Sequence, residues 1–211
     1  MENDTPNKIK ISKEIIATLP IETFPGKIVV IDNEKDADNA VLQLNNERII
    51  GFDTETRPTF KKGKSNHVAL IQLSTHDTCY LFRINRIGFT PAIKNLLENE
   101  SLLKVGISLK DDFCMLSRLN GGQFIPKNFI ELQKFVKKYN IEDQSLQKIY
   151  GIVIGKKISK GQRLSNWEAD HLTENQQLYA ATDAWSCIKI YEVLKSGKFK
   201  SPIYKIQPSS L

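Results

Sequence analysis

The chain contains few cysteines and no long hydrophobic segment. Its 211 residues include three cysteines, Cys79, Cys114 and Cys187. Their odd number and wide spacing argue against a disulfide framework or a zinc site, so we expect all three in the core. No segment approaches the roughly 20 apolar residues of a membrane span. The N-terminus also lacks the basic and then apolar order of a secretory signal. These absences predict a cytoplasmic protein that does not enter a membrane.

Charged residues are plentiful, and the positive ones prevail. Lysine and arginine number 30 against 24 aspartates and glutamates, a formal net charge of +6, and such a balance favours a polyanionic partner. Residues 1–25 hold three of the eight prolines without clear periodicity, which predicts a loosely attached arm with one short helix. Residues 26–211 are expected to form a single domain.

Hydrophobic periodicity predicts the order of elements along the chain. Strands are expected at residues 27–31, 48–56, 68–74, 79–84 and 102–107, and helices at residues 36–44, 91–99, 110–119, 132–139, 146–149 and 174–194. A hairpin turn is expected at residues 75–78, and Thr173 with Gln176 forms a capping box before the last helix. Three consecutive strands followed by alternating helices and strands predict an α/β fold, a mixed sheet with helices on both faces.

Two acids stand two positions apart in a segment that otherwise has the character of a buried strand. Asp53 and Glu55 belong to the run Ile-Ile-Gly-Phe-Asp-Thr-Glu at residues 49–55. Strand side chains alternate between faces, so both carboxylates project from the same one. Two like charges so placed repel, and desolvation adds to the cost. We therefore expect a divalent cation between them; the alternative is a strand end at which both acids reach water.

Two further acids fall on inward helix faces. Asp112 shares its face with the three apolar residues that follow at three, four and seven positions. Asp111 is expected to face outward and to interact with the helix N-terminus. Tyr179 and Asp183 lie four residues apart, on a face that continues as an apolar stripe. For Asp183 the alternatives are a nearby basic partner or a position at the mouth of the core.

Together the four acids form a pattern typical of metal-dependent phosphoryl transfer. Four carboxylates can bind two divalent cations about 4 Å apart, the arrangement used in that chemistry. No cysteine or histidine joins them, and ligation by oxygen alone suits Mg²⁺ or Mn²⁺ rather than zinc.

With these residues in place, the sequence resembles a known family. Phe-Asp-Thr-Glu at 52–55, Gly-Ile-Ser-Leu-Lys-Asp-Asp at 106–112 and Tyr-Ala-Ala-Thr-Asp at 179–183 are similar to the three exonuclease motifs of the DEDD superfamily. Tyr179 places the likeness in the DEDDy branch, where tyrosine replaces histidine. Within that branch, the sequence resembles the exonuclease domain of the Werner syndrome protein. The likeness covers about residues 25–195, with supporting segments at 68–73, 79–82 and 165–167.

The resemblance implies a ribonuclease H-like fold and 3′–5′ exonuclease activity on DNA with two divalent cations. Asp53, Glu55 and Asp183 would hold the first ion. Asp53 would bridge to the second, assisted by Asp112, and Tyr179 would orient the attacking water. The spacing from the glycine of the second motif favours Asp112 over Asp111. Because the chain ends soon after the third motif, we expect no attached helicase domain.

Basic residues next to the catalytic segments are candidates for contacts with nucleic acid, because an acidic pocket needs positive neighbours to accept a phosphate backbone. They are Arg57, Lys61, Lys62, Lys64, Lys156, Lys157, Lys160 and Arg163. A solvated charged loop is the alternative for each. Trp167 and Trp185 are candidates for stacking on bases, although core packing suits both better.

Two other functions stay open. An RNA exonuclease of the ribonuclease D type would share the fold, the metals and the motifs. A catalytically silent nuclease fold that serves as a binding module would be expected to have lost one or more of the acids, whereas all four are present.

Overall fold

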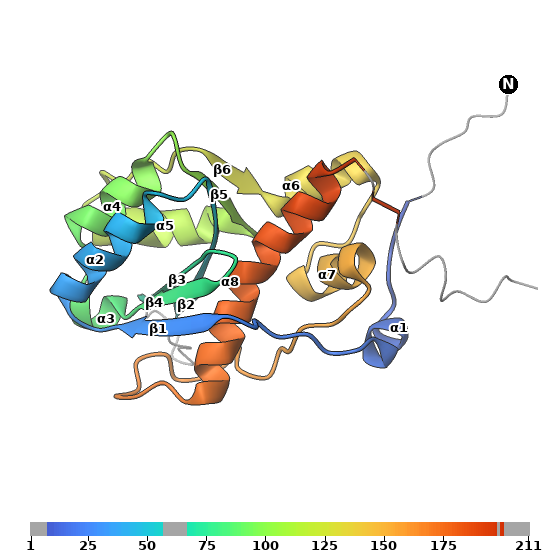
Figure 1. The fold of residues 1–211 in the computed structure, drawn as a ribbon, viewed down its shortest axis with the longest axis horizontal. Coiled ribbons are helices and arrows are strands. Elements are labelled where there is room, and N and C mark those ends of the chain that lie inside the picture. The colour runs from blue at the N-terminus through green and yellow to red at the C-terminus, as the bar shows by residue number, and fades with distance from the viewer. Residues whose placement is uncertain (1–7, 57–66, 198, 201–211) are drawn as a thin grey trace, which may run out of the picture.

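A six-stranded mixed sheet forms the centre of the molecule (Figure 1). The computed structural model describes residues 8–56, 67–197 and 199–200. The strands are β1 (Lys27–Ile31), β2 (Ile49–Thr56), β3 (Val68–Ser74), β4 (Thr78–Phe82), β5 (Leu103–Gly106) and β6 (Phe129–Glu131), in the order β1-β4-β3-β2-β5-β6. Only β3 is antiparallel to its neighbours β2 and β4; the other pairs are parallel. The predicted mixed sheet is confirmed.

Helices cover both faces of the sheet (Figure 1). One layer contains α7 (Leu146–Ile154) and α8 (Glu174–Lys195), and the other contains α2 (Glu34–Leu44), α3 (Ile84–Ile87), α4 (Pro91–Glu98) and α5 (Leu109–Leu119). Each layer has its own cluster of buried apolar side chains. The predicted capping box is present at the start of α8, where Thr173 and Gln176 bond reciprocally. No helix among the described residues combines the length and the apolar character required to cross a bilayer.

The long helix α8 lies very close to β2. A Cβ atom added to Gly51 would come within 1.9 Å of the carbonyl oxygen of Ala184 on α8. Only glycine leaves room for this approach of helix to strand. The contact fixes the height of α8 above the strand that carries Asp53 and Glu55.

The N-terminal segment is packed firmly against the α7 and α8 layer. The expected short helix is present as α1 (Lys13–Thr18), and the core includes Ile11 and Phe24. Glu22 is the main polar attachment: its carboxylate pairs with Lys156 at 2.7 Å and with Lys189 at 2.8 Å. The prediction of a loose arm is therefore wrong for residues 8–25, because its contacts lie far along the chain, where local periodicity does not reveal them.

Other local predictions need correction. The strand β6 was not predicted, and the expected helix at 132–139 divides into α6 (Leu132–Phe135) and the 3-10 helix η1 (Val136–Tyr139). The strand expected at residues 79–84 ends at Phe82, and residue 84 begins α3. Cys79 and Cys187 are buried as expected, but Cys114 is exposed on α5. The candidates Arg57, Lys61, Lys62 and Lys64 lie outside the described residues.

Candidate active site

Three carboxylates from two elements meet near the carboxyl end of β2. Asp53 and Glu55 project toward α8, and Asp183 comes from the middle of that helix. One ligand atom from each of the three lies within 4.8 Å of the others. Glu55 and Asp183 are buried and Asp53 is half-buried. The alternative of a solvated strand end therefore does not hold.

Burial and mutual repulsion make this cluster costly in the absence of a cation. Desolvation first, and then the charges of the neighbouring acids, raises the pKa of Asp53 well above its ordinary value and that of Glu55 to about 9. Desolvation also raises the pKa of Asp183 to about 7, although a hydrogen bond with Tyr179 and the charge of Lys160 oppose it. The folded cluster therefore favours either protonation or a bound positive charge.

The cluster fits a divalent metal ion. Its donors are carboxylate oxygens on a strand and a long helix, which are rigid supports, and neither histidine nor cysteine takes part. Asp53, Glu55 and Asp183 are the residues that could hold the ion. A cation there would offset the repulsion that raises their pKa values.

Asp112 approaches from the other helical layer and is not part of this three-residue cluster. Thr54, which lies between Asp53 and Glu55 and projects to the opposite face of β2, donates a hydrogen bond from its hydroxyl to the Asp112 carboxylate. Desolvation raises the pKa of Asp112 to about 6, against the effect of that hydrogen bond. Its charge also contributes to raising the pKa values of Asp53 and Glu55. Asp112 is thus a close neighbour of the cluster, held by Thr54.

The helical-face prediction for residues 111 and 112 agrees with the structure. Asp111 is exposed, whereas Asp112 is half-buried and hydrogen-bonded. Thr54 was not singled out from the sequence, since a threonine within a strand is ordinary.

Tyr179 lies one helical turn before Asp183 and is held by Trp167. The two aromatic rings are 6.1 Å apart between centroids and inclined at 35°. Desolvation, followed by the charges of Asp183 and Glu55, raises the pKa of Tyr179 far above its ordinary value, so the phenol keeps its proton. Trp167 is fully buried. The prediction that it contacts nucleic acid is therefore wrong, and its indole supports Tyr179 instead.

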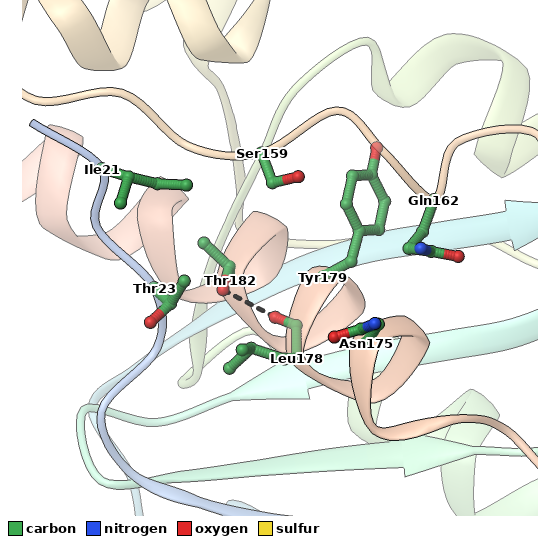
Figure 2. Close-up of a pocket in the computed structure, with 8 residues that line it drawn as sticks. All are labelled: Ile21, Thr23, Ser159, Gln162, Asn175, Leu178, Tyr179 and Thr182. Carbon is green, nitrogen blue, oxygen red and sulfur yellow. Dashed lines mark hydrogen bonds between the residues drawn. The ribbon is translucent and has the colours of Figure 1, made fainter. Parts of the chain in front are cut away.

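An uncharged cavity of about 340 Å³ borders Tyr179 (Figure 2). Its wall combines α8 with the loop before that helix, through Ser159 and Gln162, and with the N-terminal segment, through Ile21 and Thr23. Tyr179 therefore lines this cavity and also contacts Asp183 of the acidic cluster.

The basic candidates in the loop before α8 divide into two groups. Lys160 lies close enough to lower the pKa of Asp183, and Arg163 acts in the same way on Glu55. Lys156 pairs with Glu22, and Lys157 donates to the carbonyl oxygen of Ala17. These two lysines bind the N-terminal segment, so for them the predicted position beside the acids is wrong. Trp185 packs edge-on against the ring of Phe24, as the core alternative expected.

Gln72 on β3 is a further polar group beside the acids, and it was not singled out from the sequence. It is the cross-strand partner of Asp53 and is fully buried. Its amide nitrogen and oxygen have no hydrogen-bond partner among the described residues. A glutamine within the apolar run of residues 68–73 was the available signal, because a buried strand position rarely carries an unpaired polar group.

Comparison with known proteins agrees with these observations. Residues 28–197 match a family model described as 3'-5' exonuclease. Mouse bifunctional 3'-5' exonuclease/ATP-dependent helicase WRN is 36% identical over 203 residues, which cover 90% of this chain and 14% of that protein. A 3'-5' exonuclease of Arabidopsis thaliana is 28% identical over 83% of this chain and 66% of its own length. The chain therefore matches only part of the length of these relatives.

Solved structures share the fold at low sequence identity. The Nibbler EXO domain of Aedes aegypti has a TM-score of 0.75 and 23% identity, covering 88% of this chain and 94% of that one. Escherichia coli RNase D, described as an exoribonuclease involved in structured RNA processing, has a TM-score of 0.71 and 21% identity, covering 81% and 46%. The expected ribonuclease H-like architecture is thus shown.

Proposed function

The chain belongs to the 3′–5′ exonuclease family, and from this premise we propose that it removes nucleotides from the 3′ end of DNA by a mechanism with two divalent cations. The observation that carries the proposal is the meeting of Asp53, Glu55 and Asp183, which approach from β2 and α8. Buried like charges of this kind persist in a fold when the function uses them.

Each side chain has a proposed role in the reaction. Asp53, Glu55 and Asp183 would hold one ion, and Asp53 with Asp112 would hold the other. These roles follow from the likeness of Tyr179 and the four acids to the DEDDy pattern. Bound Mg²⁺ or Mn²⁺ supplies an acidified water and stabilises negative charge on the phosphate. Tyr179, which keeps its proton, orients the attacking water by hydrogen bonding and does not act as its base.

Positive side chains beside the acids would complete the phosphate site. Lys160 and Arg163 already affect the pKa values of Asp183 and Glu55. Contacts from such residues to backbone phosphates give affinity without reading the base sequence. We therefore expect digestion with little sequence preference.

RNA is the second candidate substrate, and one comparison favours it. The structure of Trypanosoma brucei RNase D in complex with RNA U12 matches this fold with a TM-score of 0.73 at 20% identity, covering 85% of this chain. We place DNA first because the sequence is more similar to the WRN protein, at 36% identity. A silent binding module is disfavoured, because three of the acids meet and the fourth is hydrogen-bonded beside them.

Digestion of matched DNA and RNA strands, each labelled at the 5′ end, tests the activity, its direction and the sugar preference together. We expect a ladder that shortens from the 3′ end with Mg²⁺ or Mn²⁺ and no products with EDTA. A circular single strand serves as the control for internal cleavage and should stay intact. Products on RNA alone would replace DNA by the second candidate, and no products with either cation would contradict the exonuclease assignment.

A further inference from the structure

A basic groove lies beside the acids, at the outer edge of the sheet. A cavity of about 920 Å³ opens between the start of α5, the edge strand β6 and the helices that follow β6. We call it the β6-edge groove and define it by Ser108, Lys110, Asn128, Glu131, Lys134 and Lys137. Asp111 and Phe113, the sequence neighbours of Asp112, also line it. The groove therefore begins next to the candidate active site.

Three exposed lysines give the groove its charge. Lys110, Lys134 and Lys137 form no ion pair with any residue in the described part of the chain. Two acids also line the groove, Asp111 and Glu131. The lysines therefore outnumber the acids, and no acid of the described residues pairs with any of the three.

The carboxylate of Glu131 is occupied by backbone donors. It accepts hydrogen bonds from the N–H groups of Ser108 at 3.1 Å, Leu109 at 2.8 Å and Gln133 at 3.0 Å. The first two bonds cap α5, whose N-cap residue Ser108 has a left-handed φ of 59° and makes no side-chain cap bond, and the third caps α6. Since Glu131 is committed to the fold in this way, its charge opposes an incoming anion less than a free carboxylate would.

The positive surface continues beyond the groove. Lys137 and Gln144 also line a second cavity of about 430 Å³, which extends to Lys8 and Lys10. Both of these lysines contact the single carboxylate of Glu142, at 2.5 and 2.8 Å. Two cations on one anion leave an excess of positive charge there as well, so the two cavities form one basic path that leads away from the acids.

We propose that the β6-edge groove binds the phosphate backbone of the substrate strand on the 5′ side of the scissile bond. The proposal rests on the proposed function, since an enzyme that works from the 3′ end must let the rest of the strand leave along its surface. Lysines along a groove follow a backbone without regard to sequence. Asn128 and Gln144 also line the groove, and each donates one amide N–H to a backbone carbonyl oxygen. The second N–H of each amide can bond to sugars and phosphates.

The groove makes substrate length matter. A trinucleotide reaches the acids but little of the groove, whereas a longer strand contacts Lys110, Lys134 and Lys137 as well. The lysines therefore raise the affinity for long strands more than for short ones. This length dependence separates a strand path from a role of the same lysines at the reacting phosphate.

The test replaces the three groove lysines together, as Lys110→Ala, Lys134→Ala and Lys137→Ala. The matched control, Lys13→Ala, Lys27→Ala and Lys35→Ala, removes the same charge from exposed positions that line neither cavity. Binding of a fluorescein-labelled single-stranded DNA of about 20 nucleotides is measured by anisotropy, between about 50 and 200 mM salt. All binding samples carry Asp53→Ala, so that the strand is not digested.

We expect the groove variant to bind at least about tenfold more weakly than the control variant. The slope of log affinity against log salt should become shallower by about 2, because three single-strand phosphate contacts contribute about 0.7 each. Replacing the same lysines by arginine should retain most of the affinity, since the charge stays. With Asp53 intact, the rise in KM should be much larger for the long strand than for a trinucleotide.

Two results would overturn the proposal. The first is an affinity and a salt slope equal to those of the control variant, in protein with an unchanged melting temperature. The second is an equal KM penalty on the trinucleotide and the long strand, which would place the lysines at the reacting phosphate. Failure of the proposed function gives a different outcome: wild-type protein would digest no strand, while the anisotropy still decides whether the groove binds one.

Discussion

The two faces of β2 make opposite contributions to the protein. Ile50 and Phe52 point into the α2 to α5 layer and are fully buried among apolar side chains, with the Phe52 ring edge-on to Phe129 at 5.3 Å. Asp53 and Glu55 alternate with them and face α8, where their pKa values are raised. One side of a single strand therefore stabilises the fold, and the other side costs free energy that only a cation or protons offset.

Polar groups without partners also lie on the α8 side. The amide of Gln72 and the hydroxyl of Ser186 are buried and have no hydrogen-bond partner among the described residues. Proteins depart from the rules of stable packing mainly where function requires it. The comparison teaches that the polar cost of this site is offset by apolar packing around it, in the clusters of both layers.

Among these variants, Asp53→Ala should show the largest effect of the α8-facing side of β2. We expect hydrolysis to fall by at least about a thousandfold, because a metal-ion site contributes several kcal/mol at about 1.4 kcal/mol per tenfold in rate. In EDTA the melting temperature of the variant should be higher than that of the wild type, and the difference should be larger at high pH. The reason is that a carboxyl whose folded-state pKa is raised destabilises the fold once it ionises. Initial rates measure the loss of hydrolysis, and thermal melts measure the change in stability. Wild-type turnover by this variant would contradict the role of Asp53 as a metal ligand.

Phe52→Ala should show the reverse behaviour. Removing a fully buried ring leaves a cavity and should cost about 3–5 kcal/mol in the free energy of unfolding. Urea denaturation measures this loss. Activity per folded molecule should change far less than in Asp53→Ala. A small stability loss would show that the α2 to α5 layer does not carry the support assigned to it.

Asp112→Ala and Asp111→Ala compare neighbours on α5. We expect about a hundredfold loss of activity for Asp112→Ala, because the change removes a proposed ligand of the second ion. Asp111 is exposed, so its loss should change the rate by less than about threefold on the same scale. Rates on one labelled DNA strand at saturating Mg²⁺ decide the matter. The reverse order would mean that the assignment of the second-motif acid is wrong.

Glu22→Gln tests a second charged cluster on the α8 side, with the opposite dependence on pH. Burial acts to raise the pKa of Glu22, but hydrogen bonds from Lys156, Lys189 and Tyr150 outweigh it and lower the pKa to about 2. Its stabilisation is therefore present at neutral pH and is lost as pH falls from about 5 to about 2. We expect the variant to lose about 1–3 kcal/mol at pH 7 and to show a flatter stability curve in that window. Urea midpoints across the pH range provide the measurement.

Local patterns predicted the parts of the site that lie within one element. Alternation along β2 placed Asp53 and Glu55 on the same face, and helical spacing distinguished Asp112 from Asp111. The capping box correctly marked the start of α8. Each of these inferences needs only the repeat of a strand or helix, which the sequence contains directly.

Contacts between distant segments were beyond such patterns. Glu22 meets Lys156 and Lys189, which lie far along the chain, so its role had no local signal. Core packing was the better-suited role for Trp167, but its partner, the ring of Tyr179, lies on another element and had no local signal. The three residues of β6 were too few to show a strand period. For the acids themselves, the family resemblance supplied the long-range information that periodicity lacked.

The closeness of α8 to β2 at Gly51 has a consequence for how this protein can vary. Asp183 stands one residue before Ala184, whose carbonyl oxygen occupies the space that a side chain at Gly51 would need. Adding one methyl group there would lift the helix and carry Asp183 away from its two companions. A protein so altered could retain every acidic residue in its sequence and yet be unable to gather them around an ion.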